Sequence, residues 1–480
     1  MSAEGLRASV EKMRNAGVAE PAIRAFEHYY RQLEAGETGL MPEDSIEPVT
    51  ELPALDDLPD DRDAQHEALQ HAIVVRLNGG LGTSMGLSKA KSLLEAKEGL
   101  SFLDIIARQV LALRERYDAA LPLVLMDSFS TQADSLAALA RHPELESDIP
   151  PDFIQNKEPK IRTDDLMPVE WPANPSLEWC PPGHGDIYTA LVTSGLLAQL
   201  LEQGYDHAFI ANSDNLGAAL DPRILAWMRA ERIPFLMEVT GRTEADRKGG
   251  HIARRREDGR LALRETAQTP EEDLENLQDI DRHRYVNTNN LWLDLHALEA
   301  AMRERDDVLG LPMIRNEKTV DPTDKSTPAV YQLETAMGAA IQVFEGARAL
   351  AVPRTRFAPV KTTDDLLALR SDAYRLEDDA SVVLAPEREG RVPFVALDSD
   401  HFKLMRDFDA RFPEGPPSLV QCDRFVVEGD VRFGAGVVVR GDVTVRQEGD
   451  EPLRIEDGTV LEDGGADHPA DASGAAAQRR

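Results

Sequence analysis

A short glycine-rich segment with two lysines carries the clearest chemistry in this sequence. It reads N-G-G-L-G-T-S-M-G-L-S-K-A-K over residues 78–91 and follows the apolar run 72–75. Glycine lets backbone N–H groups come close to phosphate oxygens, and lysine adds positive charge there. An apolar run followed by glycines suits a nucleotide site at the carboxyl end of a parallel strand. The segment therefore predicts phosphate binding rather than a plain tight turn.

Two better-known phosphate motifs do not fit this segment. In the P-loop pattern, four residues separate a first glycine from the run Gly-Lys-Ser/Thr. Counted from Gly80, the position of the second glycine is occupied by Met85, and Gly86 is followed by Leu87 instead of lysine. The dinucleotide pattern G-x-G-x-x-G fails because Met85 occupies the position of the third glycine. The segment is thus a phosphate-binding candidate of another type.

The segment resembles the nucleotide-binding loop of the eukaryotic-type UTP–glucose-1-phosphate uridylyltransferases (UDP-glucose pyrophosphorylases). The similarity continues in family order from about residue 40 to the 440s. Further matching motifs are L-M-D-S-F-S-T (125–131), F-I-Q-N-K-E-P-K-I (153–161), P-P-G-H-G-D-I-Y (181–188), A-N-S-D-N-L-G-A (211–218), N-T-N-N-L-W (287–292), Q-L-E-T-A-M-G-A-A-I (332–341) and P-V-K-T-T-D-D-L (359–366). The resemblance implies an enzyme that joins glucose 1-phosphate to the α-phosphorus of UTP and releases pyrophosphate.

The implied reaction needs positioning and positive charge more than a protein base. The attacking oxygen already belongs to a phosphate, so the difficulty is to bring two polyanions together in line. The sequence shows no Ser-His-Asp or Cys-His arrangement. The resemblance implies that Lys91 and Lys361 are catalytic and bind the nucleotide phosphates. Lys89 is a second candidate in the loop, because the family run G-P-K-S reads K-A-K-S here.

One carboxylate is a candidate magnesium ligand. Asp214 follows the strand-like run 208–211, and a carboxylate at the end of a strand near phosphates is a typical Mg²⁺ position. From the sequence alone, an Asx turn made with Asn215 is an equally good interpretation. The resemblance implies that Asp214 binds Mg²⁺, the cofactor expected here.

The resemblance also implies the remaining ligand contacts. For the nucleotide they are Leu77, Asn78, Gly79, Gly80, Lys91, Gln155, Gly183, Asn212, Ser213, Asp214 and Lys361; for the sugar phosphate they are Gly80, His184, Glu265 and Asn289. The amide of Gln155 can pair with the edge of uracil. His184 is expected to contact the sugar phosphate and not to act as a general base. The cluster 287–290 also fits a turn that leads into a strand.

The composition of the chain argues against several classes of protein. The chain has 480 residues, 42% of them hydrophobic, and a net charge of −33, which argues against nucleic acid and anionic membranes as partners. It has neither an apolar run of about 18 residues nor a signal-peptide pattern at its start. Cys180 and Cys422 are too few for a disulfide framework or a zinc site. We expect a cytoplasmic enzyme with no membrane partner.

The pattern of apolar residues predicts an α/β fold. Candidate strands are 73–77, 121–126, 208–211, 235–239 and 291–293, and candidate helices are 102–117, 132–141, 187–201 and 222–229. Alternation of this kind predicts a Rossmann-like, mixed but mostly parallel sheet, and the resemblance implies a GT-A-like nucleotidyltransferase core. Residues 1–37 are expected to form two helices, and residues 38–70 an extended segment.

The C-terminal part has a different period. Valine or phenylalanine recurs every six residues at Val427, Phe433, Val439 and Val445, and the spacing breaks at 447–452. A six-residue period predicts a short left-handed parallel β-helix with one inserted loop, although a hairpin with alternating valines is the simpler alternative.

Together, these patterns predict four parts of the chain: an N-terminal segment (1–70), a catalytic domain (71–385), a C-terminal domain (386–464) and a disordered tail (465–480). The β-helix is the expected route to a homo-oligomer. Two alternative functions stay open: a broad-specificity UDP-sugar pyrophosphorylase and a non-catalytic nucleotide-sugar sensor. The presence of Lys91, Asp214 and Lys361 argues against the sensor, which would be expected to lose them.

Overall fold

A computed structural model describes residues 2–449 and 451–462 of the chain, so the predicted tail 465–480 lies outside the described residues. The chain divides into two compact units: Met1–Gly80 with Ile106–Phe357, and Leu81–Ile105 with Ala358–Arg480. The glycine-rich loop is therefore split between Gly80 and Leu81. The four-part division drawn from the sequence stays a prediction.

The first unit is built on a mixed sheet of ten strands with the order β1-β12-β14-β10-β2-β5-β6 and with β11, β13 and β17 attached. Its strands are β1 (Ile46–Pro48), β2 (Ala72–Leu77), β5 (Leu123–Asp127), β6 (Asp152–Ile154), β10 (His207–Asn212), β11 (Phe235–Gly241), β12 (His251–Arg255), β13 (Leu261–Arg264), β14 (Tyr285–Asp294) and β17 (Arg348–Ala351). Strands β10, β2, β5 and β6 run parallel, whereas β14 is antiparallel to β10 and β11. The prediction of a mixed α/β fold with a largely parallel centre is confirmed.

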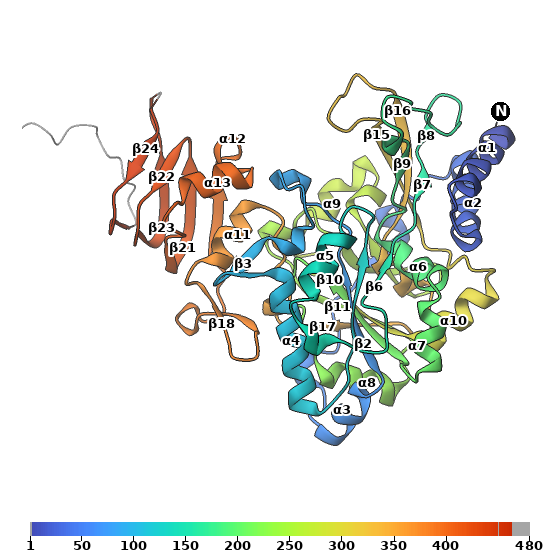
Figure 1. Cartoon of the computed structure of the whole chain (residues 1–480), viewed down its shortest axis with the longest axis horizontal. Helices are drawn as coiled ribbons and strands as arrows, with labels where there is room; N and C mark the ends of the chain where they lie inside the picture. Colours follow the sequence, from blue (N-terminus) through green and yellow to red (C-terminus); the bar gives the residue numbers. More distant parts are fainter. Residues whose placement is uncertain (1, 450, 463–480) are drawn as a thin grey trace, which may run out of the picture. The chain divides into compact units, whose positions relative to one another are not determined.

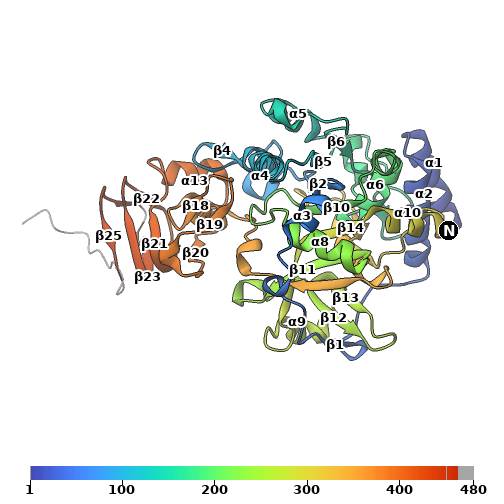
Figure 2. The same cartoon turned by 90° about the horizontal axis from the view of Figure 1, so that it is seen from below.

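Helices cover both faces of this sheet. The helices of the first unit are α1 (Ser2–Asn15), α2 (Glu20–Glu34), α3 (Arg62–Leu69), α4 (Phe102–Tyr117, which begins at the unit boundary), α5 (Gln132–Leu139), α6 (Ile187–Thr193), α7 (Leu196–Glu202), α8 (Pro222–Glu231), α9 (Leu274–Gln278) and α10 (Leu295–Glu304). Figures 1 and 2 show α4 on one side of the sheet and α6 and α10 on the other. Parallel strands covered on both faces are apolar throughout, and Ile73, Val74 and Val75 of β2 are all buried.

The structure differs from the sequence-based expectation at two helices. The helix expected over 187–201 is two helices, because Gly195 has a φ of 76° and ends the first. Within the segment expected to be extended, residues 62–69 form α3. Asp61 caps this helix by accepting hydrogen bonds from the N–H groups of Asp63 and Ala64, both at 3.1 Å.

Smaller sheets complete the first unit. In one, β7 (Glu158–Pro159) pairs with β9 (Trp179–Cys180). In the other, β16 (Ala329–Thr335) lies between β15 (Met313–Thr319) and β8 (Ile161–Arg162) and pairs with both. Buried side chains of α1 and α2, among them Phe26 and Tyr30, pack with Ile161 and Leu333 of these strands. Among the described residues, no helix is both long and apolar enough to cross a membrane.

The second unit contains parallel strands in its C-terminal part. They are β20 (Phe394–Leu397), β21 (Ser418–Glu428), β23 (Val438–Arg446) and β25 (Val460–Leu461) in one sheet, and β22 (Val431–Phe433) and β24 (Leu453–Ile455) in another. The remaining elements are β3 (Glu95–Lys97), β4 (Leu100–Ser101), β18 (Tyr374–Leu376), β19 (Val382–Leu384), α11 (Thr363–Arg370), α12 (Ser399–Phe402) and α13 (Met405–Arg411).

The register of these parallel strands shows an 18-residue separation over part of β21 and β23. Val427 of β21 pairs with Val445 of β23, which is 18 residues later, or three steps of six. Val431 pairs with Leu453, which is 22 residues later, because the interruption at 447–452 lies between them. The side chains of Val427, Phe433, Val439 and Val445 are all buried. The parallel sheets agree with the six-residue period, while the β-helix itself stays a prediction.

Candidate functional site

The first half of the glycine-rich loop lies at the carboxyl end of β2 and is fixed by side chains. Asn78 is buried, and its Nδ2 donates to Asp127 Oδ1 and to Ser135 Oγ, both at 2.7 Å. A Cβ atom on Gly79 would lie 3.0 Å from Gln155 Oε1. Gly79 therefore lets the predicted uracil contact, Gln155, pack directly against the loop. Among the described residues other than Gly80 and its two chain neighbours, no atom lies within 4 Å of the corresponding position on Gly80.

Asp127 is a positioning residue that the sequence analysis did not single out. It is fully buried at the end of β5, and burial raises its pKa to about 6. Besides Asn78, its carboxylate accepts from Thr131 Oγ1 at 3.0 Å, and its backbone carbonyl accepts from the N–H of Gln155 at 2.9 Å. Asp127 thus joins the loop to Gln155. The rule applied to Asp214, a carboxylate at the carboxyl end of a strand, would have found it.

His184 is held as a neutral hydrogen-bond donor. Gly183 precedes it with a φ of 80°, and a Cβ atom there would lie 2.6 Å from the carbonyl oxygen of Thr335. The N–H of Met337 donates to His184 Nδ1 at 3.0 Å, so the proton of the neutral ring is on Nε2. Burial lowers the pKa of His184 to about 4. The ring can donate to a phosphate oxygen, which supports the expectation that it is not a general base.

A buried carboxylate connects this turn to the segment that carries Gln155. Asp186 accepts from the backbone N–H of Asn156 at 2.6 Å and from its Nδ2 at 2.9 Å. Burial raises the pKa of Asp186 to about 6. The Asn156–Asp186 pair therefore fixes the predicted base contact relative to the predicted sugar-phosphate contact, His184.

Asp214 follows β10 beside the loop. Asn212 pairs with Leu77 in the parallel register of β10 and β2, and the N–H of Ser213 donates to the carbonyl of Leu77 at 3.2 Å. The next residue, Asp214, is half-buried at the same edge of the sheet. Asn215 then donates from Nδ2 to Asn290 Oδ1 at 3.3 Å, which ties this turn to β14.

The asparagine cluster lies within β14 rather than in a turn before a strand. The pairing of β14 with β11 is irregular between Met237 and Val239, opposite this cluster. Asn289 has a φ of 58°, and its backbone N–H donates to Asn287 Oδ1 at 2.9 Å. A Cβ atom on Gly338 would lie 2.9 Å from Asn287 Nδ2. The irregularity presents Asn289, the predicted sugar contact, in a backbone conformation that a regular strand lacks.

Glu265 lies against the same strand. The N–H of Asn287 donates to the carbonyl of Gly250 at 3.0 Å. A Cβ atom on Gly250 would lie 2.4 Å from Glu265 Oε2, so the Glu265 carboxylate lies directly against Gly250. Glu265 also caps the short helix that follows β13, together with Gln268. The weaker sugar candidate, Glu265, therefore lies near the asparagine cluster that carries the preferred candidate, Asn289.

These contacts form a closed ring, which we call the polar circuit. It runs from Leu77, Asn78 and Gly79 to Gln155, through Asn156 and Asp186 to His184, through Met337 and Gly338 to Asn287, and through Asn290, Asn215 and Ser213 back to Leu77. Every member belongs to the first unit. The segments that carry most of the predicted nucleotide and sugar-phosphate contacts of this unit are thus linked to one another by contacts and by chain neighbours.

The two predicted catalytic lysines belong to the second unit. Lys91 begins a short 3₁₀ helix, Lys91–Leu93, after the loop, and a Cβ atom on Gly82 would lie 3.4 Å from Lys91 Cβ. Lys361 is exposed, and its backbone N–H donates to Asp365 Oδ2 at 2.8 Å as part of the cap of α11. Lys89 is exposed as well. The structure does not test their roles, which stay predictions.

The residues present fit Mg²⁺ better than a protein-enclosed metal. Within residues 2–449 and 451–462, no group of three or more His, Cys, Asp and Glu side chains could hold a metal ion. Mg²⁺ commonly binds through one or two carboxylates and takes its other ligands from phosphates and water. Asp214, which follows Ser213 and its bond to Leu77 before the glycine-rich loop, offers such a carboxylate.

Comparison with known proteins agrees with this geometry. Residues 23–440 match the family model of the UTP–glucose-1-phosphate uridylyltransferases. The barley (Hordeum vulgare) enzyme of that name is 40% identical over 415 residues, covering 86% of this chain and 85% of its own length. The UDP-glucose pyrophosphorylase of Leishmania major, solved as a mutant in complex with UDP-glucose, is 50% identical with a TM-score of 0.91, covering 96% of this chain and 99% of that chain.

A Trypanosoma brucei structure described as a UDP-glucose phosphorylase is 46% identical with a TM-score of 0.89, covering 96% of this chain and 99% of that chain. Similarity of this extent includes both units and nearly the whole of each relative. The chain belongs to the UTP–glucose-1-phosphate uridylyltransferase family.

Proposed function

We propose that this enzyme makes UDP-glucose and pyrophosphate from UTP and glucose 1-phosphate. The polar circuit is the observation that carries the proposal. It links the predicted phosphate-binding loop, the predicted uracil contact Gln155 and the asparagine cluster predicted to bind the sugar, which supports the proposal. The relatives described above carry the same activity in their names.

In the proposed mechanism, a phosphate oxygen of glucose 1-phosphate attacks the α-phosphorus of UTP in line, and pyrophosphate leaves. The backbone N–H groups of Gly79 and Gly80 bind the nucleotide, and Gln155 pairs with the uracil edge. Lys91 and Lys361 neutralise phosphate charge as it shifts to the leaving group. Mg²⁺, when bound at Asp214, supplies further charge neutralisation on the nucleotide phosphates.

The sugar phosphate lies on the other side of the circuit in this proposal. Nε2 of His184 donates to its phosphate, because Nδ1 already accepts from Met337. Asn289 and Glu265 bind sugar hydroxyls. Each such contact rejects a sugar that lacks the matching hydroxyl, since a buried polar group is then left unpaired.

The test is pyrophosphate release by the purified protein with UTP, Mg²⁺ and a panel of sugar 1-phosphates. Release with glucose 1-phosphate alone is the expected result. Comparable release with several sugars would replace the proposal with a broad-specificity UDP-sugar pyrophosphorylase. Folded protein that binds UTP but releases no pyrophosphate with any sugar would indicate a nucleotide-sugar sensor. Omission of Mg²⁺ should abolish release.

We also propose that the parallel sheets of the second unit form a short left-handed β-helix that joins protomers into a homo-oligomer. The 18-residue separation between Val427 and Val445 supports three six-residue sides per turn. Light scattering of the full chain tests this assembly: a monomer at all concentrations would contradict it. The two free cysteines, Cys180 and Cys422, are buried and fit a reducing cytoplasm, which cell fractionation can test.

A further inference from the structure

An exposed phenylalanine lies beside the glycine-rich loop and has no role in the mechanism above. The side chain of Phe129 is 71% exposed, compared with 39–48% for the other exposed large hydrophobic residues. Single exposed hydrophobic residues are common, so exposure alone assigns no role. The position of this ring is the informative property.

The backbone around Phe129 is fixed to the loop. The hydroxyl of Ser128 donates to the carbonyl of Gly79 at 3.0 Å, and the N–H of Ser128 donates to Thr131 Oγ1 at 2.9 Å. Thr131 in turn donates to Asp127, the carboxylate that holds Asn78. The ring is therefore held next to the predicted nucleotide site while most of its surface faces solvent.

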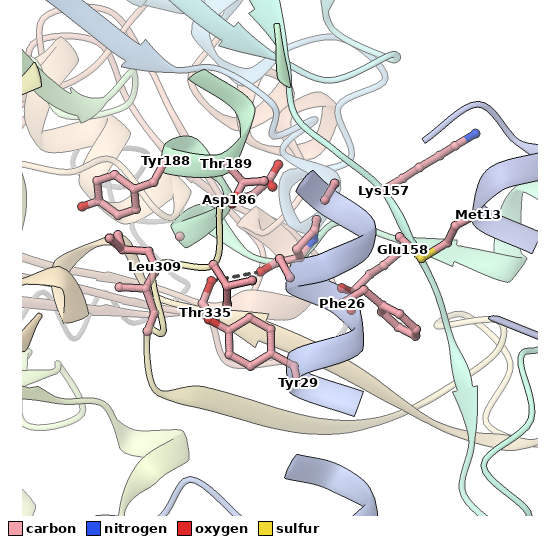
Figure 3. A pocket seen from close by; sticks show the side chains of 16 residues that line it. Met13, Phe26, Tyr29, Lys157, Glu158, Asp186, Tyr188, Thr189, Leu309 and Thr335 are labelled. Carbon is pink, nitrogen blue, oxygen red and sulfur yellow. Dashed lines mark hydrogen bonds between the residues drawn. The ribbon is translucent and has the colours of Figure 1, made fainter. Parts of the chain in front are cut away.

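A lysine lies over the same ring. Lys157 Nζ is 5.7 Å from the centroid of Phe129 and 4.6 Å from a ring of Trp179, both within cation–π range. Figure 3 shows the Lys157 side chain extending away from the small cavity that Glu158 and Asp186 line. In a chain with a net charge of −33, this lysine is held between two aromatic rings, one of which belongs to the residue after Ser128.

The neighbouring contacts indicate which part of the nucleotide the pair would meet. Gln155, the predicted uracil contact, is two residues before Lys157 and packs against Gly79. Gly79 is also the residue to which Ser128 binds, next to Phe129. Gly79, Gln155, Phe129 and Lys157 are therefore connected to one another by direct contacts or through an adjacent residue.

We propose that Phe129 and Lys157 form the outer wall of the uracil subsite. The phenyl ring packs on the face of the pyrimidine, and the ammonium group donates to one of its carbonyl oxygens. Cytosine carries an amino group in place of one carbonyl, so Lys157 favours UTP over CTP. This inference rests on the proposed function and adds to it two residues that set nucleotide affinity and choice.

Calorimetric titration of the full-length protein with UTP and with CTP tests the inference. Phe129→Ala should weaken UTP binding roughly 10-fold, since stacking on a base is worth about one to three kcal/mol and 1.4 kcal/mol is tenfold. Phe129→Leu, which keeps an apolar side chain without a ring, should have a smaller effect. Lys157→Met, which keeps the length and removes the charge, should lower the preference for UTP over CTP roughly 10-fold.

Phe394→Ala is the matched control. Phe394 is 44% exposed and has Arg424 Cζ 4.3 Å from its ring centroid, but it lies on β20 of the second unit. This variant should bind UTP as the wild-type protein does. Wild-type affinity for UTP in Phe129→Ala would overturn the inference, as would an unchanged UTP/CTP ratio in Lys157→Met. If the wild-type protein itself neither binds UTP nor releases pyrophosphate, the proposed function fails instead.

Discussion

The polar circuit of the first unit and the parallel sheets of the second unit bury very different side chains. The circuit depends on buried carboxylates and amides such as Asp127, Asp186 and Asn290, each with named hydrogen-bond partners. The parallel sheets bury apolar side chains such as Val439 and Val445 at a regular spacing. Burying a polar group costs free energy unless it is hydrogen-bonded, whereas burying a valine is favourable by itself.

The difference indicates that polar contacts mainly fix the positions of side chains in the first unit, whereas apolar burial mainly stabilises the second unit. Glu238 is fully buried and accepts from Trp292 Nε1 at 2.9 Å, from Asn290 Nδ2 at 3.0 Å and from Arg356. Such a network adds little net stability but fixes one arrangement of the chain. Substitutions at the predicted ligand contacts are therefore expected to change activity. Substitutions in the parallel sheets of the second unit are expected to change the free energy of unfolding.

The largest effect is expected at the predicted metal ligand. Asp214→Ala should lower the rate of pyrophosphate release by about 10³-fold, because loss of a metal's charge costs several kcal/mol of transition-state stabilisation. The control is Asp164→Ala, also in the first unit, whose side chain is 69% exposed beside Arg162. If Asp214→Ala turns over as fast as the control variant, Asp214 is not a ligand of the catalytic metal.

A smaller loss of activity is expected at Lys361. Lys361→Ala should lower kcat by roughly 10²-fold, as expected for one cation that stabilises phosphate charge. The melting temperature should not change, because Lys361 is exposed and only its backbone N–H is bonded in the cap. Lys403→Ala, another exposed lysine of the second unit, is the control. An unchanged kcat would show that Lys361 is a surface residue without a catalytic role.

The apolar sheets should show the opposite pattern. Val439→Ala removes two buried methyl groups and should lower the free energy of unfolding by about 2 kcal/mol. The kcat of the folded protein should stay at the wild-type value. Val460→Ala is matched in chemistry, but its side chain is 46% exposed in β25, so its unfolding should hardly change. Equal destabilisation by both substitutions would contradict the regular burial of the series.

The smallest effect is expected from two buried histidines in the first unit. The rings of His251 and His283 are fully buried and stacked 3.8 Å apart, with His283 Nε2 3.1 Å from Glu43 Oε1. Burial lowers the pKa of both rings. Both histidines therefore bind a proton more readily in the unfolded chain than in the folded protein. Their contribution to the free energy of unfolding is complete above the ordinary histidine pKa of about 6.5 and is lost as the pH falls below it.

The free energy of unfolding should therefore fall as the pH drops below about 6.5. Urea unfolding at several pH values measures this slope, which His251→Gln should reduce. His296→Gln, at an exposed position on α10, should leave the slope unchanged. A pH-independent unfolding free energy in the wild-type protein would show that the stacked pair stays neutral in both states or is charged in both.

The sequence by itself predicts much of this protein because strong local patterns coincide with the fold. The run of apolar residues from Ile73 and the helix Phe102–Tyr117 are found as predicted, since each has an uninterrupted period. The six-residue series of valines is buried as expected. The motifs also identify the family, because whole segments of the chain match in order.

Other features depend on contacts between residues far apart in the sequence. The strand-end rule could have pointed to Asp127, but its partner Asn78 and the bond between Asp186 and Asn156 follow only from the tertiary structure. The position of the asparagine cluster inside β14 follows from its irregular pairing with β11, since the same residues alone favour a turn. The tautomer of His184 is decided by the N–H of Met337, 153 residues later in the chain. Local sequence fixes which residue types are available, and tertiary packing decides which atoms they face.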